Sequence, residues 1–480
     1  MKFGKIYIEA ENHIRLFVWG GDVNMCMNRM IGMRILFCIG CLYLTGCGLS
    51  DKNEKQSLEK TDIHEVQAVS IPEYPMEPIY KKEEERWEAN RSRRQSVPEA
   101  FVSAYEEFAV NTASGLLADS TENMIYSPLS FYYALAVAAE GADGTTKEEL
   151  LKLLGYADAE QLSNDAKAYF EVVYHVPNEE NNKANEWGEY PSESRYTLSI
   201  ANSLWADESV RLKDAFTKRA SEYYYSEVYQ GDLQSENTAK AMGEWVKEKT
   251  NGVLAPSFKE NSQGIVLTLL NTVYFYDEWM DRFDKEKTKE DIFFCGDGSE
   301  VTAEFMNRTM GSHGFRKGDN FTASSLSLKN GSMEFYLPDE GVNVHDLIDT
   351  PEKMEALLNR SGEQMMGEVV WKVPKFSYGS SMNLVELLKK LGVENAFTSD
   401  ADFSNISDMT PLFISKVKQD AHIGIDENGV EAAAFTEISW AGAALPQGRA
   451  EMILNRPFFY VIRNKGKIVF MGVCEKVREE

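Results

Sequence analysis

Residues 426–446, DENGVEAAAFTEISWAGAALP, combine the spacing of a strand with the composition of a loop. If residues 430–440 are extended, Val430, Ala432, Ala434, Thr436, Ile438 and Trp440 share one face, and Glu431, Ala433, Phe435, Glu437 and Ser439 share the other. This period of two is typical of a half-buried strand, but alanine, glycine and proline are poor strand formers. Because small side chains pass easily between strands, we expect a loop that lies outside a sheet and can later join it as a strand. The alternative is an alanine-rich surface loop whose alternation is accidental.

Length and composition limit the fold and the partners. The chain has 480 residues, enough for two or three average domains or for one large α/β or α+β domain with an appendage. Hydrophobic residues make up 43% of it, so a substantial core can form. Its formal net charge of -26 argues against nucleic acid or an anionic membrane as a partner. The six histidines show no paired metal-ligand spacing, so no metal site is expected.

Residues on both sides of the small-residue run resemble a known family. ENGVEAAA, residues 427–434, resembles the proximal hinge of the reactive-centre loop of serpins. Arg456-Pro-Phe-Phe459 followed by Phe470-Met-Gly472 is similar to the C-terminal signature of that family, at the expected separation. The resemblance implies an α+β serpin fold, in which helices pack around a large mixed central sheet, with two smaller sheets and an exposed reactive-centre loop.

Further motifs extend the resemblance to residues 97–480. They are, in order, NMIYSPLS at 123–130, NSLW at 202–205, WV with TNG at 245–252, the apolar run 265–276 leading to Trp279, and FYLPD at 335–339. Gly243 stands where an asparagine is usual. The resemblance implies that the central sheet opens near Ser127, Ser130, Asn271, Trp279 and Gln419. The two serines could instead be simple helix caps. Gln419 stands where many serpins carry a histidine that bonds the asparagine matching Asn271.

The N-terminal region has the pattern of an export signal. Met33-Arg34 precedes a short apolar run at 35–43, and Leu44-Thr-Gly-Cys47 resembles the bacterial lipobox. We therefore expect a signal region at 1–46, with translation starting at Met1 or at Met27, Met30 or Met33, and a lipid on Cys47. An ordinary signal peptide with a chance cysteine is the alternative. Residues 47–96 are polar and charge-rich, which predicts a disordered tether between the anchor and a serpin domain at 97–480. The expected location is the cell surface of a bacterium.

No catalytic motif accompanies these features. The sequence has no nucleophile elbow, phosphate-binding loop, HExxH or CxxC pattern, so neither an enzyme nor a cofactor is expected. The resemblance implies that the loop is itself a protease substrate, cleaved between Ala443 and Ala444, with Ala443 seventeenth when counted from Glu427. The freed segment would then insert into the sheet and trap the acyl-enzyme. The implied hinge consists of Glu427, Gly429, Val430, Glu431, Ala432, Ala433 and Ala434.

Residues near the implied reactive bond suggest which protease is trapped. Ala443-Ala444, with Trp440 nearby, suits the shallow pocket of an elastase-like serine protease. A bond shifted to Leu445 would favour a chymotrypsin-like enzyme. A papain-like cysteine protease is a further possible target of a monomeric inhibitor. The alternative from another class is a non-inhibitory serpin-fold binding protein that is cleaved without trapping, and an exported hydrolase is disfavoured.

Overall fold

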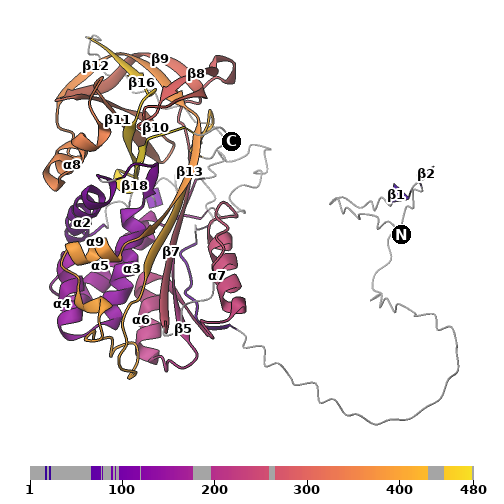
Figure 1. Cartoon of the computed structure of the whole chain (residues 1–480), viewed down its shortest axis with the longest axis vertical. Helices are drawn as coiled ribbons and strands as arrows, with labels where there is room; N and C mark the ends of the chain where they lie inside the picture. The colour runs from indigo at the N-terminus through magenta and orange to yellow at the C-terminus, as the bar shows by residue number, and fades with distance from the viewer. Residues whose placement is uncertain are drawn as a thin grey trace. The chain divides into compact units, whose positions relative to one another are not determined.

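The structure is a computed structural model of the chain, which falls into two compact units, residues 1–62 and 63–480 (Figure 1). It describes residues 17–18, 21–22, 66–76, 78, 88–89, 92, 97–118, 120–176, 196–258, 265–430 and 448–477. In the first unit, β1 (Phe17–Val18) pairs antiparallel with β2 (Gly21–Asp22). The rest of the predicted signal region at 1–46, and Cys47 directly after it, lie outside the described residues. Within the described ranges, no helix is both long and apolar enough to cross a membrane.

The sheet that faces the predicted loop has seven strands. Its order is β13-β14-β7-β5-β6-β3, and β15 pairs with β7 beside this path. The bounds are β3 Gln67–Ser70, β5 Thr197–Asp207, β6 Ser226–Gly231, β7 Leu267–Glu278, β13 Phe376–Asn383, β14 Val417–Ile425 and β15 Gly429–Val430. The apolar run at 265–276 forms most of β7, which pairs with β5 on one side and with β14 on the other. A strand with neighbours on both sides and packed faces accounts for that apolar run.

The other sheet has nine strands in the order β16-β12-β9-β10-β11-β17-β18-β4, with β8 paired to β9. The bounds are β4 Met124–Tyr126, β8 Lys289–Phe294, β9 Glu300–Gly318, β10 Phe321–Ser327, β11 Gly331–Pro338, β12 Glu363–Pro374, β16 Arg449–Ile453, β17 Phe458–Asn464 and β18 Lys467–Cys474. The α+β fold with a large mixed sheet is confirmed. The two smaller sheets expected from the sequence are joined here, because the long strand β9 pairs with β12 along most of its length and with β10 at its end.

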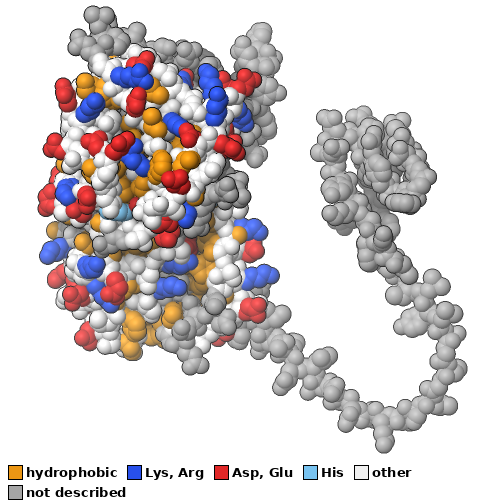
Figure 2. Space-filling view, turned by 45° about the horizontal axis from the view of Figure 1, so that its top comes forward, with side chains coloured by type: hydrophobic (Ala, Val, Ile, Leu, Met, Phe, Trp, Pro, Cys, Tyr) orange, Lys and Arg blue, Asp and Glu red, His pale blue; other side chains and the backbone are white. Residues whose placement is uncertain are grey.

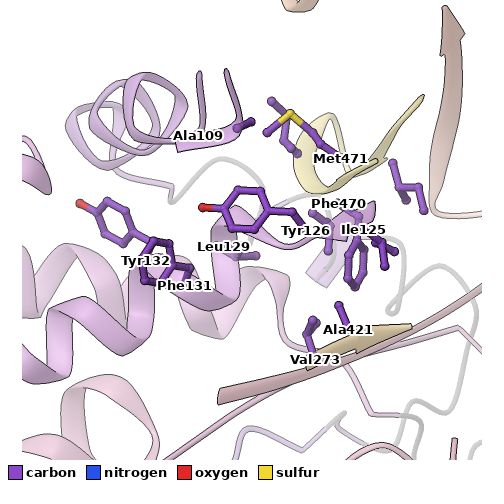
Figure 3. Close-up of a cluster of buried hydrophobic side chains, with 14 of the residues drawn as sticks. Ala109, Ile125, Tyr126, Leu129, Phe131, Tyr132, Val273, Ala421, Phe470 and Met471 are labelled. Carbon is purple, nitrogen blue, oxygen red and sulfur yellow. The ribbon is translucent and has the colours of Figure 1, made fainter. Parts of the chain in front are cut away.

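Helices cover one side of the seven-stranded sheet, and α7 lies on the other (Figure 1). The bounds are α2 Glu99–Leu117, α3 Pro128–Gly141, α4 Gly144–Leu153, α5 Ala159–Val173, α6 Asp214–Tyr224, α7 Glu236–Lys249, α8 Pro351–Leu358 and α9 Val385–Lys390, with short helices η2 Lys285–Lys287, η3 Val344–Leu347 and η4 Asn395–Phe397. Almost every residue of α3 is buried. Figure 3 shows Leu129 and Phe131 at its start within the core that includes Phe470 and Val273. On the face in Figure 2, acidic and basic side chains are interspersed.

Part of the predicted tether belongs to the fold. Strand β3 pairs antiparallel with β6 and forms the edge of the seven-stranded sheet. Beyond it, the ring of Tyr74 stacks on Tyr174, with centroids 5.2 Å apart. The expected boundary at residue 97 is therefore corrected for residues 66–76. The charge-rich composition of the region as a whole conceals this short segment, VQAVSIPEY at 66–74, whose apolar and β-branched residues suit an edge strand.

His345 forms hydrogen bonds that connect η3 with the end of α2 and with the residue that follows β18. His345 in η3 lies with Nε2 2.8 Å from Oε1 of Glu475, which follows β18. Its Nδ1 lies 2.9 Å from the carbonyl oxygen of Leu117, the last residue of α2. The hydrogen bond to Glu475 raises the pKa of His345, although burial alone would lower it. The charged imidazolium is therefore favoured in the folded protein.

His345→Gln should lower stability mainly at acidic pH. Folding raises the pKa of His345, so the charged imidazole contributes its full stabilisation below the ordinary value of about 6.5. This contribution is lost as pH rises through the pKa of His345 in the folded protein. We expect the variant to lose about 1 kcal/mol relative to wild type at pH 5.5, and less at pH 8.5, in urea unfolding followed by tryptophan fluorescence. An equal loss at the two pH values would contradict a charged histidine at this position.

Candidate functional site

The seven-stranded sheet is closed at one end and parted at the other. Strand β14 pairs with β7 only over residues 417–420 and 269–272. Beyond that point the two strands border a gap. It is lined by Val273, Tyr274 and Phe275 of β7, His422, Ile423 and Gly424 of β14, Val430 of β15, Thr250, Val253 and Leu254 after α7, and Ile125, Ile462 and Phe470 of the core. This gap lies between two strands that each pair with a neighbour on the far side, so a strand that entered it would have a partner on both sides.

Where the gap closes, a polar cluster joins both strands to the start of α3. We call Ser127, Ser130, Asn271 and Gln419 the shutter cluster; none is more than 7% exposed. The amide of Asn271 donates to the carbonyl of Ser130 at 2.9 Å and accepts from its hydroxyl. Gln419 accepts from the backbone N–H of Ser127 at 2.9 Å and donates to its carbonyl at 3.0 Å. These bonds satisfy buried polar groups at the point where the strands part.

The structure brings four of the five predicted sheet-opening residues together in this cluster. The helix-cap interpretation holds as well for Ser127, whose hydroxyl accepts from the N–H of Ser130 and donates to the carbonyl of Val469. Gln419 reaches Asn271 only at 3.5 Å, so its amide serves chiefly the backbone of Ser127. Sequence reasoning missed Asn202 of β5, whose side chain accepts from the amide of Asn271. The NSLW motif pointed to its strand, but not to this contact.

The fifth predicted residue, Trp279, lies at the far end of the gap, where the hinge begins. Its indole N–H donates to the carbonyl of Asp426 at 2.9 Å, and its backbone N–H to that of Asn428 at 3.1 Å. Gly429 and Val430 then pair antiparallel with Glu278 and Asp277. A Cβ on Gly429 would lie 2.6 Å from the Asp277 carbonyl oxygen, so a side chain there would require β7 to move.

The side chains of Asp426 and Glu427 fix the turn that leads into the hinge. The carboxylate of Asp426 accepts from the N–H groups of Asn428 and Gly429 at 2.8 and 3.2 Å. Glu427 is 5% exposed and accepts from the hydroxyl of Thr288 at 2.8 Å, while Lys375 lies 3.6 Å away. Burial acts to raise the pKa of Glu427, but hydrogen bonds from Thr288 and from its own backbone N–H, together with the charges of Lys375 and Lys285, lower that pKa overall.

The remaining predicted site residues cannot be placed. Glu431, Ala432, Ala433 and Ala434 of the hinge, and the reactive bond Ala443–Ala444, lie outside the described residues. The description resumes at Gly448, just before β16. The structure therefore gives the two ends of the predicted loop and the gap beside its first end.

Asp277 is an acidic residue at the hinge that sequence reasoning missed. Its side chain is 1% exposed, and its carboxylate accepts 2.9 Å bonds from the N–H groups of Asn330 and Glu278. Burial raises the pKa of Asp277 from 3.8 to about 7, because these neutral donors compensate only part of the lost hydration. Glu278, by contrast, lies 2.6 Å from the ammonium of Lys329. Nothing in the sequence distinguishes the two neighbouring acids.

Comparisons with known proteins agree on one family. A family model described as serpin (serine protease inhibitor) matches residues 103–477. The chain is 31% identical over 381 residues to serpin A3-6 of Bos taurus, which covers 78% of this chain and 87% of that protein. It is also similar to the native state of the thermophilic serpin tengpin, with a TM-score of 0.67, 28% identity, and coverage of 79% of this chain and 95% of the other. A likeness to human thyroxine-binding globulin, with a TM-score of 0.64, 22% identity, and coverage of 78% and 100%, shows the fold alone.

Asp277→Asn should stabilise the protein at neutral and alkaline pH. Because the pKa is raised on folding, stability falls as pH rises from about 4 to 7 and stays reduced above 7. Asparagine avoids this penalty, so we expect a gain of up to about 4 kcal/mol at pH 8, the free-energy equivalent of the raised pKa. At pH 5 the gain should be smaller, about 1.6 kcal/mol, because the carboxyl is already ionised in the unfolded chain but still protonated in the folded one. Urea unfolding at the two pH values measures this, and an unchanged midpoint at pH 8 would rule out a buried, uncompensated carboxylate.

Proposed function

The chain belongs to the serpin family, and on that premise we propose that it is a suicide-substrate inhibitor of serine proteases. A target protease attacks the carbonyl carbon of Ala443, its serine forms an ester, and the amine of Ala444 leaves. Water would normally release the acyl-enzyme. Here the freed residues 430–443 insert into the gap between β7 and β14 and carry the protease along. Fourteen residues at ~3.3 Å each span roughly 46 Å, enough to separate the protease from its original docking position.

The observation that carries this proposal is the antiparallel pairing of Gly429 and Val430 with the end of β7. The first two residues of an additional strand are already in register beside the gap. If that register continues, each later loop residue lies opposite the preceding residue of β7, so Thr436 comes opposite Asn271 (430 + 6 and 277 − 6). Val430 is buried among core residues, so with that register the even-numbered residues would face inward. Ala432 and Ala434 come first and need little space, while Ile438 and Trp440 follow further along.

The proposed target is an elastase-like protease. Ala443 offers a small side chain to the primary specificity pocket, and a shallow pocket selects such residues. A reactive bond shifted to Leu445 would direct the inhibitor toward chymotrypsin-like enzymes. Papain-like cysteine proteases also form acyl-enzymes and could be trapped by the same insertion.

A non-inhibitory role is the alternative. Human thyroxine-binding globulin shares the fold and was solved with thyroxine, so this fold also hosts ligand binding. The hinge favours inhibition, because Val430 is small, uncharged and already packed in the gap. A charged or bulky residue facing the core in this first part of the loop would oppose the start of insertion.

We further propose that the protein is exported, carries a lipid on Cys47 and acts as a monomer at a bacterial cell surface. The sequence Leu44-Thr-Gly-Cys47 after a short apolar run supports this. Residues 48–65 would form the connection between Cys47 and the segment at 66–76, which already belongs to the sheet.

Mixing the full chain with elastase should give a covalent complex. We expect a band at the summed mass on a denaturing gel, resistant to boiling, and a released peptide whose mass spectrum places its first residue at Ala444. A heat-inactivated inhibitor is the control. Cleavage without any complex, across elastase-, chymotrypsin- and papain-like enzymes, would refute inhibition and leave the binding-protein alternative.

Val430→Glu should convert the inhibitor into a substrate. The new carboxylate would lie unpaired in the core opposite Asp277, so we expect it to expel the hinge from the gap, and insertion would then have to bury the charge again. We expect roughly tenfold more inhibitor to be consumed per protease trapped, the effect of about 1.4 kcal/mol on the partition. Val430→Thr, of similar shape, is the matched control and should trap normally. If Val430→Glu traps as efficiently as wild type, the hinge does not insert at this position.

A further inference from the structure

A buried carboxylate joins three elements on the face of the sheet away from α3. Glu227 of β6 is 1% exposed, and the ammonium of Lys249, the last residue of α7, lies 2.6 Å from it. The indole N–H of Trp245, also in α7, donates to Glu227 at 2.7 Å. The hydroxyl of Tyr74, in the N-terminal segment, donates to the same carboxylate at 3.2 Å. One side chain thus holds α7 and the N-terminal segment on the edge of the sheet.

The N-terminal segment, residues 66–76, is here called the strap. It lies outside residues 103–477, which match the serpin family model. The hydroxyls of Ser70 in β3 and Ser221 in α6 are 2.7 Å apart. Tyr74 also donates to the carbonyl of Tyr225 at 3.2 Å, and the ammonium of Lys249 lies 5.5 Å from the centre of its ring. The strap therefore contacts α6, β6 and α7 together.

The residues that follow α7 border the gap between β7 and β14. The proposed function requires the cleaved loop to fill this gap. Thr250 and Leu254 line that gap. The hydroxyl of Thr250 donates to the carbonyl of Val246 in α7 at 2.8 Å and accepts from the N–H of Leu254 at 3.1 Å. A Cβ on Gly243 would lie 2.8 Å from the Pro256 carbonyl oxygen, so α7 and the chain after it are closely packed. A strand that enters the gap must push against these residues, and through them against α7.

We propose that Glu227, with Lys249, Trp245 and Tyr74, forms a latch that resists the displacement of α7 and so sets the rate at which the loop inserts. These are positioning residues, because they act on the gap through α7 and do not contact the reactive bond. The inference rests on the proposed function and adds its regulation. Trapping competes with hydrolysis of the acyl-enzyme, so a weaker latch speeds insertion. A weaker latch therefore raises the share of proteases that are trapped. It also lets the uncleaved loop insert spontaneously.

The test uses the full chain and two variants that weaken the latch. Tyr74→Phe removes only the hydroxyl and keeps the stacked ring, whereas Lys249→Met removes the charge. Arg219→Met is the matched control, because Arg219 pairs with the partly buried Glu140 between α6 and α3, away from the gap. Two quantities are measured: the molar ratio of inhibitor to elastase at full inhibition, and the rate at which inhibitory activity disappears on incubation at 37 °C as a heat-resistant form accumulates.

Each latch variant should lower the molar ratio and speed the spontaneous conversion, roughly tenfold for Lys249→Met, which loses a charge-assisted hydrogen bond. The double variant should show less than the sum of the two effects, because both act on Glu227. The matched control Arg219→Met should lower only the melting temperature. If the latch variants likewise lower the melting temperature without a lower molar ratio or a faster conversion, their role is only structural and the latch is refuted. If wild type traps no protease, the proposed function fails, while the rate at which the heat-resistant form accumulates still tests the latch by itself.

Discussion

The hydrogen bonds between Asn271, Gln419 and the start of α3 lie where the seven-stranded sheet changes from paired to parted. On one side of them β7 and β14 are paired, and on the other the strands separate around a gap. Buried amides cannot lose their partners without a large penalty, so a new strand must supply replacements as it passes. The structure therefore resembles an incomplete sheet whose missing strand would begin at Gly429. The small residues after it suit such a path.

Glutamine at position 419 changes the character of this cluster. Serine, asparagine and glutamine side chains do not titrate near neutral pH, so the described shutter cluster carries no protonation switch of its own. The histidine nearest to it on β14, His422, faces Ser377 and has its pKa lowered by burial. Beside the hinge, burial raises the pKa of Asp277 to about 7. A group that titrates near neutral pH therefore lies at the point where the described end of the loop meets the sheet.

The sequence was informative where short motifs determine local structure. The apolar run predicted β7, and the resemblance around Ser127 and Asn271 anticipated residues that lie in contact. Prediction from the sequence failed where the role of a residue depends on contacts with residues far away in the chain. Thr146 and Glu149 have the spacing of a capping box, yet Asp143 caps α4, and Glu149 instead accepts from the backbone of Glu394 and Asn395. Asp277 and Glu227 look like ordinary surface acids in the sequence, because burial is decided by strands far away. Average composition also concealed the strap within a charged region.

The strap has a consequence for self-association. A strand at the edge of a sheet presents unpaired backbone groups that can bind another chain, and β3 covers that edge of β6. The cover is itself short and is followed directly by Pro72, two features that discourage further pairing, whereas the exposed side chains of Val69 and Ile71 favour it. A protease that cut before residue 97 and released the strap would uncover the longer edge of β6. The protein would then carry one sheet with an open edge on one side and an unfilled gap further in, two places at which copies of the chain could join into polymers.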